Sequence, residues 1–232
     1  MEVFHLTPLE WEALRLSLQV SVWAVVGSLP AGIVAAWVLA RCRFPGKWLL
    51  DGLIHLPLVL PPVVIGYLLL VMLGKKGLVG KLLYDFLGIQ LAFTWKGAAV
   101  AAAVMAFPLL VRAVRLSIEA VDRGLEDAAR TLGAGRVRVF FTITLPLITP
   151  GLITGTILAF ARSLGEFGAT ITFVSNIPGQ TQTLPLALYS LTQVPNGEAG
   201  ALRLCVVALV VALAAMIFSE WISRRFAAHV EG

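Results

Sequence analysis

The feature that most constrains this chain is a long apolar run near its N-terminus. Residues 16–40 contain no charged side chain. The hydrocarbon core of a membrane is about 30 Å thick, and a helix needs about 20 residues to cross it. Because no water inside the bilayer can satisfy exposed backbone groups, this run is predicted to be a transmembrane helix. Gly27, Pro30 and Gly32 in its middle predict a kink.

Four more segments have the length and hydropathy of membrane spans, and the composition agrees with them. The sequence is 59% hydrophobic and 13% charged, with a mean hydropathy of +0.90, whereas soluble domains carry about 25% charged residues. We therefore predict one all-α polytopic membrane domain over residues 10–225, with five transmembrane helices. An apolar piece at 184–191 is too short to span and is expected to form a re-entrant or surface helix. The predicted spans are residues 16–40, 53–73, 97–117, 147–174 and 204–222.

Several function classes are disfavoured by what the sequence lacks. The net charge of +5 does not indicate nucleic-acid binding, because no basic run is interleaved with aromatic residues in a polar segment. Cys42 and Cys205 fall on opposite membrane sides in the predicted topology and lack metal-ligand spacing. The histidines His5, His55 and His229 are scattered, and no catalytic motif accompanies them. We expect no catalytic site, no metal and no cofactor on this chain.

The glycine-rich segment 74–81 looks at first like a phosphate-binding loop. Gly74 and Gly80 are six residues apart rather than five, and Leu82 stands where a Ser or Thr must reach the magnesium ion. Both departures argue against ATP binding on this chain. The lysines of this segment either favour the approach of an anion or are plain surface charge.

Residues 122–146, the longest charged segment, begin with a helical pattern. Four apolar residues recur at i, i+3, i+4 and i+7, which places them in a narrow stripe beside a charged face. Asp122 can cap the N-terminus of this helix, and Gly133 supplies the left-handed residue that ends it. The stripe consists of Leu125, Ala128, Ala129 and Leu132, and the charged face of Arg123, Glu126, Asp127 and Arg130.

This segment resembles the cytoplasmic EAA loop of ABC importer permeases. The family pattern is Glu-Ala-Ala, three residues, Gly, nine residues, then Ile-x-Leu-Pro. Residues 127–129, Gly133 and 143–146 match it with every spacing kept. Asp127 replaces the family's Glu, and Glu126 stands one position earlier, so either carboxylate can fill that role.

The resemblance implies that residues 122–146 form a coupling loop, which docks into a separate ATPase subunit and passes its motion to the membrane helices. A solvated connector between two spans is the alternative, but it explains neither the spacing nor the stripe. The residues that the resemblance and the stripe assign to ATPase coupling are Leu125, Glu126, Asp127, Ala128, Ala129, Leu132 and Gly133.

Two charged residues lie inside the predicted fourth span. Arg162 and Glu166 are four residues apart and so share one helical face. Charges at this depth cost a few kcal/mol, so they usually pair or face a cavity. They either line the conduction path or form a local ion pair, and the two readings are compatible. Ser163 and Thr170 are further candidate pathway residues, although each hydroxyl can instead bond a carbonyl of its own helix.

Residues 160–179 closely resemble the molybdate permeases of ABC importers, and the resemblance covers nearly the whole chain. It includes residues 55–64 and 130–150. The Arg-x-x-Gly-Glu-aromatic-Gly pattern at 162–168 also looks like the sulfate permeases, so this piece alone indicates a tetrahedral oxyanion importer. The longer match favours molybdate, with tungstate or sulfate as alternatives.

The resemblance further implies the type I ABC importer permease fold and a set of partners. These are a second copy of the chain, two ATPase subunits that bind ATP, an extracytoplasmic molybdate-binding protein and the lipid of a bacterial inner membrane. A secondary anion transporter is the less favoured class, because it would normally need inverted repeats and coupling-ion carboxylates, and we find no repeat. A membrane enzyme is disfavoured by the missing catalytic motifs.

The distribution of Lys and Arg predicts the orientation. With the coupling loop in the cytoplasm, basic residues favour that side, the N-terminus lies outside and the C-terminus inside. The cytoplasmic set is Arg41, Arg43, Lys47, Arg112, Arg115, Arg123, Arg130, Arg136, Arg138, Arg224 and Arg225, and the opposite set is Arg15, Lys75, Lys76, Lys81, Lys96 and Arg203.

Overall fold

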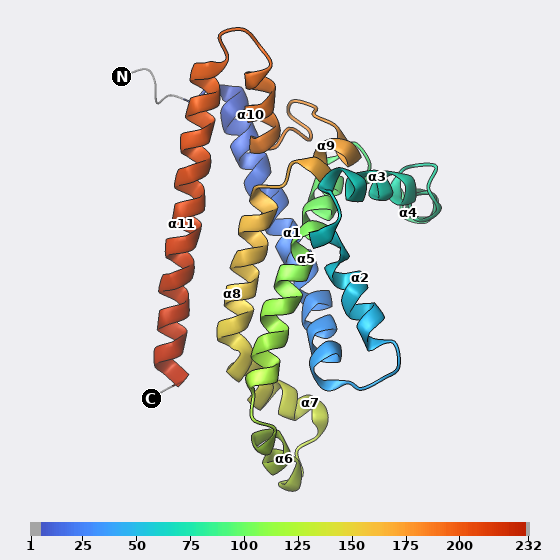
Figure 1. The fold of residues 1–232 in the computed structure, drawn as a ribbon, viewed down its shortest axis with the longest axis vertical. Helices are drawn as coiled ribbons and strands as arrows, with labels where there is room; N and C mark the ends of the chain where they lie inside the picture. Colours follow the sequence, from blue (N-terminus) through green and yellow to red (C-terminus); the bar gives the residue numbers. More distant parts are fainter. Residues whose placement is uncertain (1–5, 231–232) are drawn as a thin grey trace.

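A computed structural model describes residues 6–230, with side chains described through residue 218. The described part consists of helices joined by turns, and the long helices run side by side in a bundle (Figure 1). Four helical stretches are long and apolar enough to cross a membrane, and a bent pair of shorter helices raises the number to five. The all-α prediction is confirmed, and the five-span count holds when that pair is taken as one span.

The first span, α1 (Pro8–Arg41), starts eight residues before the charge-free run. Thr7 caps it, since the Thr7 hydroxyl accepts from the Glu10 backbone N–H while the Glu10 carboxylate accepts from the Thr7 N–H. Glu10 also pairs with Arg203 across 2.9 Å. The helix therefore extends beyond the N-terminal end of the predicted span, and a capping box and an ion pair keep charged residues inside it.

The second predicted span, residues 53–73, is not one helix. α2 (Lys47–Val59) and α3 (Pro62–Leu73) meet at a bend of 115°. Leu60 adopts extended backbone, as a residue before a proline prefers, and Pro62 opens α3. The Pro61–Pro62 pair thus divides the predicted span into two helices.

The fourth predicted span, residues 147–174, is also broken. α8 (Leu145–Leu164) ends near Gly165, and the short helix α9 (Gly168–Val174) follows in a different direction (Figure 1). α3 and α9 pack closely against each other. A Cβ at Gly66 would stand 2.5 Å from the Ala169 carbonyl oxygen, and one at Gly168 would stand 2.8 Å from Pro62 Cβ. The two broken spans therefore meet through glycines.

The glycines of segment 74–81 join α3 to α4 (Leu78–Leu87). A Cβ at Gly77 would collide with backbone carbonyls of Val71 and Met72, and one at Gly80 with those of Leu73 and Gly74. This spacing therefore serves the close packing of α4 onto the end of α3.

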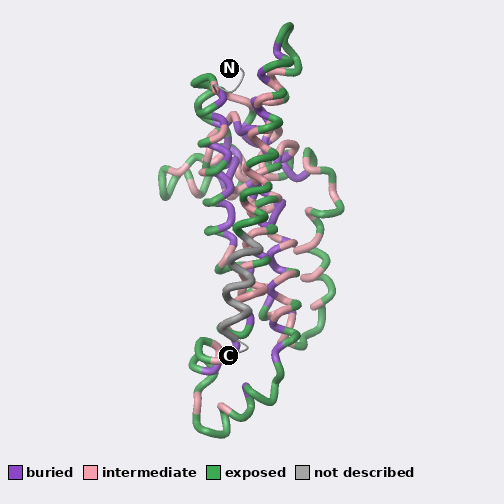
Figure 2. The backbone as a smooth tube through the Cα atoms, turned by 90° about the vertical axis from the view of Figure 1, so that its left-hand side faces the viewer, coloured by how far each residue is buried: buried purple, intermediate pink, exposed green. Residues whose placement is uncertain are grey.

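α5 (Trp95–Ala120) lies at the centre of the bundle between α1 and α8. Small residues set this packing, with Ala98, Ala101 and Ala102 fully buried. Two glycines let α8 pack closely on α5, because a Cβ at Gly151 would collide with the Ser117 hydroxyl and one at Gly155 would stand 3.0 Å from Ala113 Cβ. In Figure 2 the buried residues follow these central helices, and the lowest part of the chain is largely exposed.

The remaining helices complete both ends of the bundle. α10 (Leu184–Thr192) packs on α1 and α11 (Glu198–Val230), and the Leu184 N–H donates to the buried Ser17 hydroxyl across 2.6 Å. At the other end, α6 (Arg123–Thr131), α7 (Arg136–Val139) and the π-helix η2 (Phe140–Thr144) lead into α8. Figure 1 places α6 at the end of the bundle where α11 ends, and α4, α9 and α10 nearer the N-terminus. The side chains of Arg224 and Arg225 lie outside the described residues.

Candidate functional site

The predicted helix of the coupling loop is present as α6, with the expected signals at its ends. The Asp122 carboxylate accepts from the Gly124 N–H at 2.8 Å, which caps the N-terminus. Gly133 has φ +86° and lies just beyond the helix, where its N–H donates to the Arg130 carbonyl at 3.0 Å. The start and stop read from the sequence are confirmed.

The apolar stripe of α6 is open to the surroundings of the chain. Leu125 is 49% exposed and Leu132 is 89% exposed. Ala128 is exposed between them, and Ala129 is half-buried. A leucine this exposed at the end of a bundle adds apolar surface that water does not favour, so the stripe is suited to a protein partner.

Glu126 turns in the opposite direction and is 7% exposed. Its Oε1 lies 3.1 Å from Arg41 Nη2, at the end of α1, and accepts from the Thr144 hydroxyl at 2.8 Å. Arg41 also donates to the Val121 carbonyl at 3.5 Å. We call Arg41, Glu126 and Thr144 the buried node. It ties α6 to the first span and to the start of the fourth.

Asp127 has a different environment from Glu126. Its carboxylate pairs with Arg130 one turn along the helix at 3.1 Å, and the two side chains are 67% and 49% exposed. The two carboxylates of the predicted charged face therefore differ, because Glu126 is buried and Asp127 is exposed. The structure assigns the inward carboxylate to Glu126 and the outward one to Asp127.

The π-helix η2 places Thr144 in the buried node. η2 inserts between α7 and α8 and carries the buried Thr144 at its last position. Single-turn π segments often mark functional positions. Sequence reasoning did not single out Arg41 or Thr144, because both contact Glu126 from distant parts of the chain. The one available signal was that Arg41 is the first charge after a long apolar run.

Replacing each carboxylate by Ala separates their contributions. Glu126→Ala should lower the free energy of unfolding by about 3 kcal/mol, because it leaves the nearly buried Arg41 guanidinium unpaired. Asp127→Ala should cost less than about 1 kcal/mol, since its ion pair is exposed. Thermal unfolding of the purified chain in one detergent measures both variants. Equal losses would contradict the assignment of the buried node to Glu126.

The second candidate site lies at the break between α8 and α9. Arg162 Nη1 lies 2.6 Å from Glu166 Oε2, and the Arg and Glu side chains are 27% and 2% exposed. The other carboxylate oxygen of Glu166 accepts from the Ala169 N–H at 2.8 Å. The prediction that the two residues share one helix was wrong, because α8 ends at Leu164. They form an ion pair that also holds the start of α9.

The hydroxyls near this break differ in their partners. Ser163 is 4% exposed, and its hydroxyl has no hydrogen-bond partner among the described residues. Thr170 is 1% exposed. The Thr172 hydroxyl donates to the Gly168 carbonyl of its own helix, and the Asn176 amide donates to the Ser190 hydroxyl. Ser163 is the clearest polar group left over beside the ion pair.

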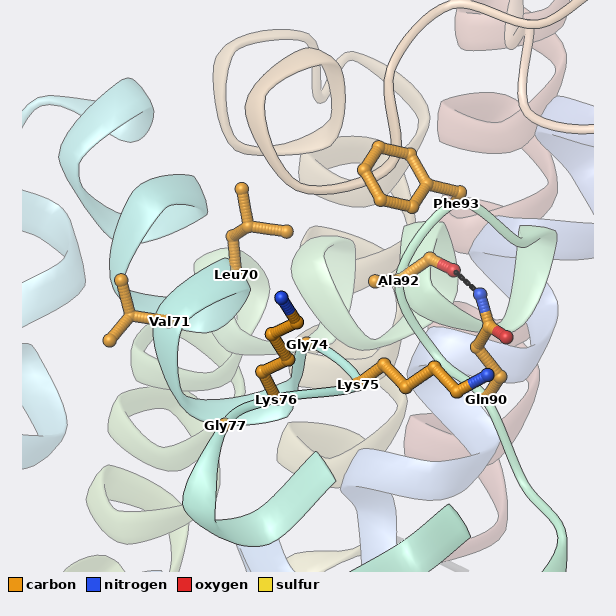
Figure 3. A pocket seen from close by; sticks show the side chains of 9 residues that line it. All are labelled: Leu70, Val71, Gly74, Lys75, Lys76, Gly77, Gln90, Ala92 and Phe93. Carbon is orange, nitrogen blue, oxygen red and sulfur yellow. Dashed lines mark hydrogen bonds between the residues drawn. The ribbon is translucent and has the colours of Figure 1, made fainter. Parts of the chain in front are cut away.

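A cavity of about 330 Å³ (Figure 3) lies among α3, the turn before α4 and the residues before α5, far from α6 in Figure 1. Lys75, Lys76 and Gln90 border it, and Phe93 closes one side. The Lys75 ammonium lies 4.4 Å from the centre of the Tyr84 ring, which gives that lysine a cation–π contact. Gln90 donates to the Ala92 carbonyl at 3.2 Å. One of the three lysines of segment 74–81 is therefore committed to packing.

Comparison with known proteins gives close relatives. The chain is 65% identical over 219 residues to the molybdenum transport system permease protein ModB of Escherichia coli K12, covering 94% of this chain and 96% of the relative. The ModB of Haemophilus influenzae is 58% identical over 94% of this chain and 95% of its own length. The sulfate transport system permease protein CysT of Salmonella typhimurium is 42% identical, over 68% of this chain and 57% of its own length.

A solved structure has the same fold. A bacterial alginate ABC transporter, in complex with a periplasmic protein that carries an alginate pentasaccharide, contains a chain that superposes with a TM-score of 0.72. The match covers 94% of this chain and 80% of that chain, at 18% identity. The family model described as binding-protein-dependent transport system inner membrane component matches residues 28–228. The chain therefore belongs to this family of inner membrane transport components.

Proposed function

We propose that this chain is the transmembrane permease subunit of an ATP-driven importer that carries molybdate across the bacterial inner membrane. The observation that carries the proposal is the exposed apolar stripe of α6, held against the spans by the buried node. An ATPase subunit that grips the stripe would move α1 and α8 through Glu126. Hydrolysis of ATP belongs in this scheme to the partner and not to this chain.

The substrate assignment rests on the relatives. Molybdenum permeases match this chain along nearly its whole length, whereas the sulfate permease matches over about two thirds of it and at lower identity. Molybdate, tungstate and sulfate are all divalent tetrahedral oxyanions, so the pathway needs donors and weak positive potential for any of them. Ser163 and Arg162 are the pathway candidates that the break between α8 and α9 supplies.

The proposed assembly contains two copies of this chain, two ATPase subunits and an extracytoplasmic molybdate-binding protein. The alginate transporter with its bound periplasmic protein supports such an arrangement by its fold. We propose that the coupling loop faces the cytoplasm and that the N-terminus lies outside. Both the Lys and Arg distribution and the need of the ATPase for cytoplasmic ATP favour this orientation.

Reconstituted vesicles test the function and the substrate together. The chain, its ATPase subunit and its binding protein are placed in liposomes, and ATP-dependent uptake of molybdate, tungstate and sulfate is measured at equal concentrations. We expect uptake of molybdate that requires both partners, with sulfate taken up far less. Faster uptake of sulfate would overturn the substrate, and uptake without ATP would overturn the transporter class.

Lys81→Ala should leave ATP hydrolysis by the assembled transporter almost unchanged. Lys81 is exposed on α4, which lies far from α6, and its glycine neighbours serve helix packing rather than phosphate binding. Steady-state release of phosphate by the purified complex measures the effect. A collapse of turnover with the complex still assembled would show that this segment takes part in nucleotide chemistry.

A further inference from the structure

A cavity of about 640 Å³ lies between the end of α1 and the segment formed by α6, α7 and η2. Its volume falls within the range of about 300–1,000 Å³ that is usual for small-molecule sites. One wall is apolar and comes from α1 and η2. The other wall is basic and comes from α6 and the start of α7. The residues of the two walls that matter here are Val34, Trp37 and Phe141, and Arg123, Arg130 and Arg136.

The basic wall carries charge that the protein itself does not neutralise. Arg41 is committed to Glu126 in the buried node, and Arg130 pairs with Asp127. Arg123 and Arg136 are exposed, and for neither does the described part of the chain provide an ion pair or a side-chain hydrogen bond. Two guanidinium groups therefore face this cavity with their donors free.

The apolar wall indicates the depth of the cavity in a membrane. Trp37 lies one turn before the end of α1 and is 41% exposed, and tryptophan is enriched where the hydrocarbon core meets the headgroups. Val34 is 62% exposed and Phe141 is 60% exposed. Exposed apolar side chains at the end of a span are expected to contact lipid chains. The cavity therefore opens at headgroup depth, with its apolar side toward the bilayer.

The cavity and the apolar stripe use different faces of α6. Arg123, Glu126, Asp127 and Arg130 recur at helical spacing, and all four line the cavity. Leu125 and Leu132 belong to the stripe, which is not part of the cavity lining. A partner bound to the stripe would leave the cavity face of the helix to another ligand.

We propose that this cavity binds an anionic phospholipid of the leaflet next to α6. Arg123 and Arg136 would hold the phosphate, because a guanidinium forms paired hydrogen bonds to phosphate oxygens. The acyl chains would lie along Val34, Trp37 and Phe141. Basic pockets beside transmembrane helices are known to suit anionic headgroups. The lipid would bridge α1, α6 and the start of α7 at the point where the buried node already joins two spans.

Native mass spectrometry of the complete transporter tests the proposal. The complex is stripped in detergent and offered equal amounts of phosphatidylglycerol and phosphatidylethanolamine of the same chain length. We expect the wild-type complex to retain phosphatidylglycerol. In the double variant Arg123→Gln with Arg136→Gln, the retained amount should fall at least about tenfold. Arg43→Gln is the matched control, since Arg43 is an exposed arginine beyond the same end of α1 and does not line the cavity.

A second variant and a soluble ligand keep the test decisive. Arg123→Lys with Arg136→Lys preserves the charge but not the paired hydrogen bonds, and should retain lipid between the wild type and the glutamine variant. Millimolar inorganic phosphate or molybdate should not displace the lipid.

Three outcomes would overturn the lipid site. They are equal retention of the two lipids, a glutamine variant that binds as the wild type does, and displacement by either soluble anion. Loss of the ATPase subunit from the glutamine variant with its lipid retained would assign these arginines to the ATPase instead.

Discussion

Ala129→Glu is expected to leave the chain in the membrane while abolishing both recovery of the ATPase subunit and uptake. Ala129 is half-buried in the stripe between Leu125 and Leu132, where a small side chain allows close approach of a partner. A Glu there would bring an unpaired charge and extra volume into an apolar contact. Co-purification of the ATPase with the tagged permease measures the loss, and vesicle uptake measures its consequence.

Gly133→Val should produce the same loss through the backbone. Gly133 has φ +86°, a conformation that a β-branched residue does not adopt without strain, so the end of α6 would shift. Ala120→Glu is the matched control, because Ala120 is exposed at the same end of the molecule but lies outside α6. Normal recovery of the ATPase with Ala129→Glu or Gly133→Val would contradict the assignment of the stripe of α6 as the docking surface for the ATPase. An equal loss with Ala120→Glu would contradict it as well.

Arg162→Ala and Glu166→Ala should each reduce the yield of folded transporter strongly, and the double variant should recover more than additivity predicts. Removing one partner of a buried ion pair costs about 3–5 kcal/mol, because the other charge stays behind unpaired. Glu166 is 2% exposed at its side chain and Arg162 is 27% exposed, so the loss of Arg162 should strand the more deeply buried charge. Glu166→Ala also removes the acceptor of the Ala169 N–H.

Yield and uptake together decide what this ion pair does. If the pair serves stability alone, the double variant should regain yield and uptake alike. If Arg162 or Ser163 contacts the permeating anion, yield should return while uptake stays low, and Ser163→Ala should lower uptake without lowering yield. Strictly additive losses in both measurements would show that Arg162 and Glu166 do not depend on each other, against the 2.6 Å contact.

The parts of the fold that the sequence predicted depend on local interactions. Asp122 and Gly133 mark the start and the end of α6, because a cap and a left-handed residue act within one turn of the chain. The direction in which Glu126 points depends on Arg41 and Thr144, which reach it through tertiary packing. Helical periodicity placed Glu126 and Asp127 on one face, and could not tell which of them would be buried.

The two broken spans show the same limit in another form. The sequence contains Pro61 and Pro62, but a proline pair predicts a kink as readily as a full break. The bend of 115° between α2 and α3 also accompanies the tertiary packing of α9 on α3. The end of α8 carried a weaker signal. Residues 147–174 are largely apolar, and the charges of Arg162 and Glu166 in that run did not show that the backbone leaves the helix after Leu164.

Ion pairs join both ends of the first span to other helices. Glu10 joins its beginning to Arg203 of α11, and Arg41 joins its end to Glu126 of α6. A continuous helix of 34 residues, about 51 Å long at 1.5 Å per residue, resists compression much better than bending. A displacement of α6 would therefore be transmitted along α1 to the start of α11. The variant Arg203→Gln would remove the contact between the start of α1 and α11 while leaving the helix itself intact.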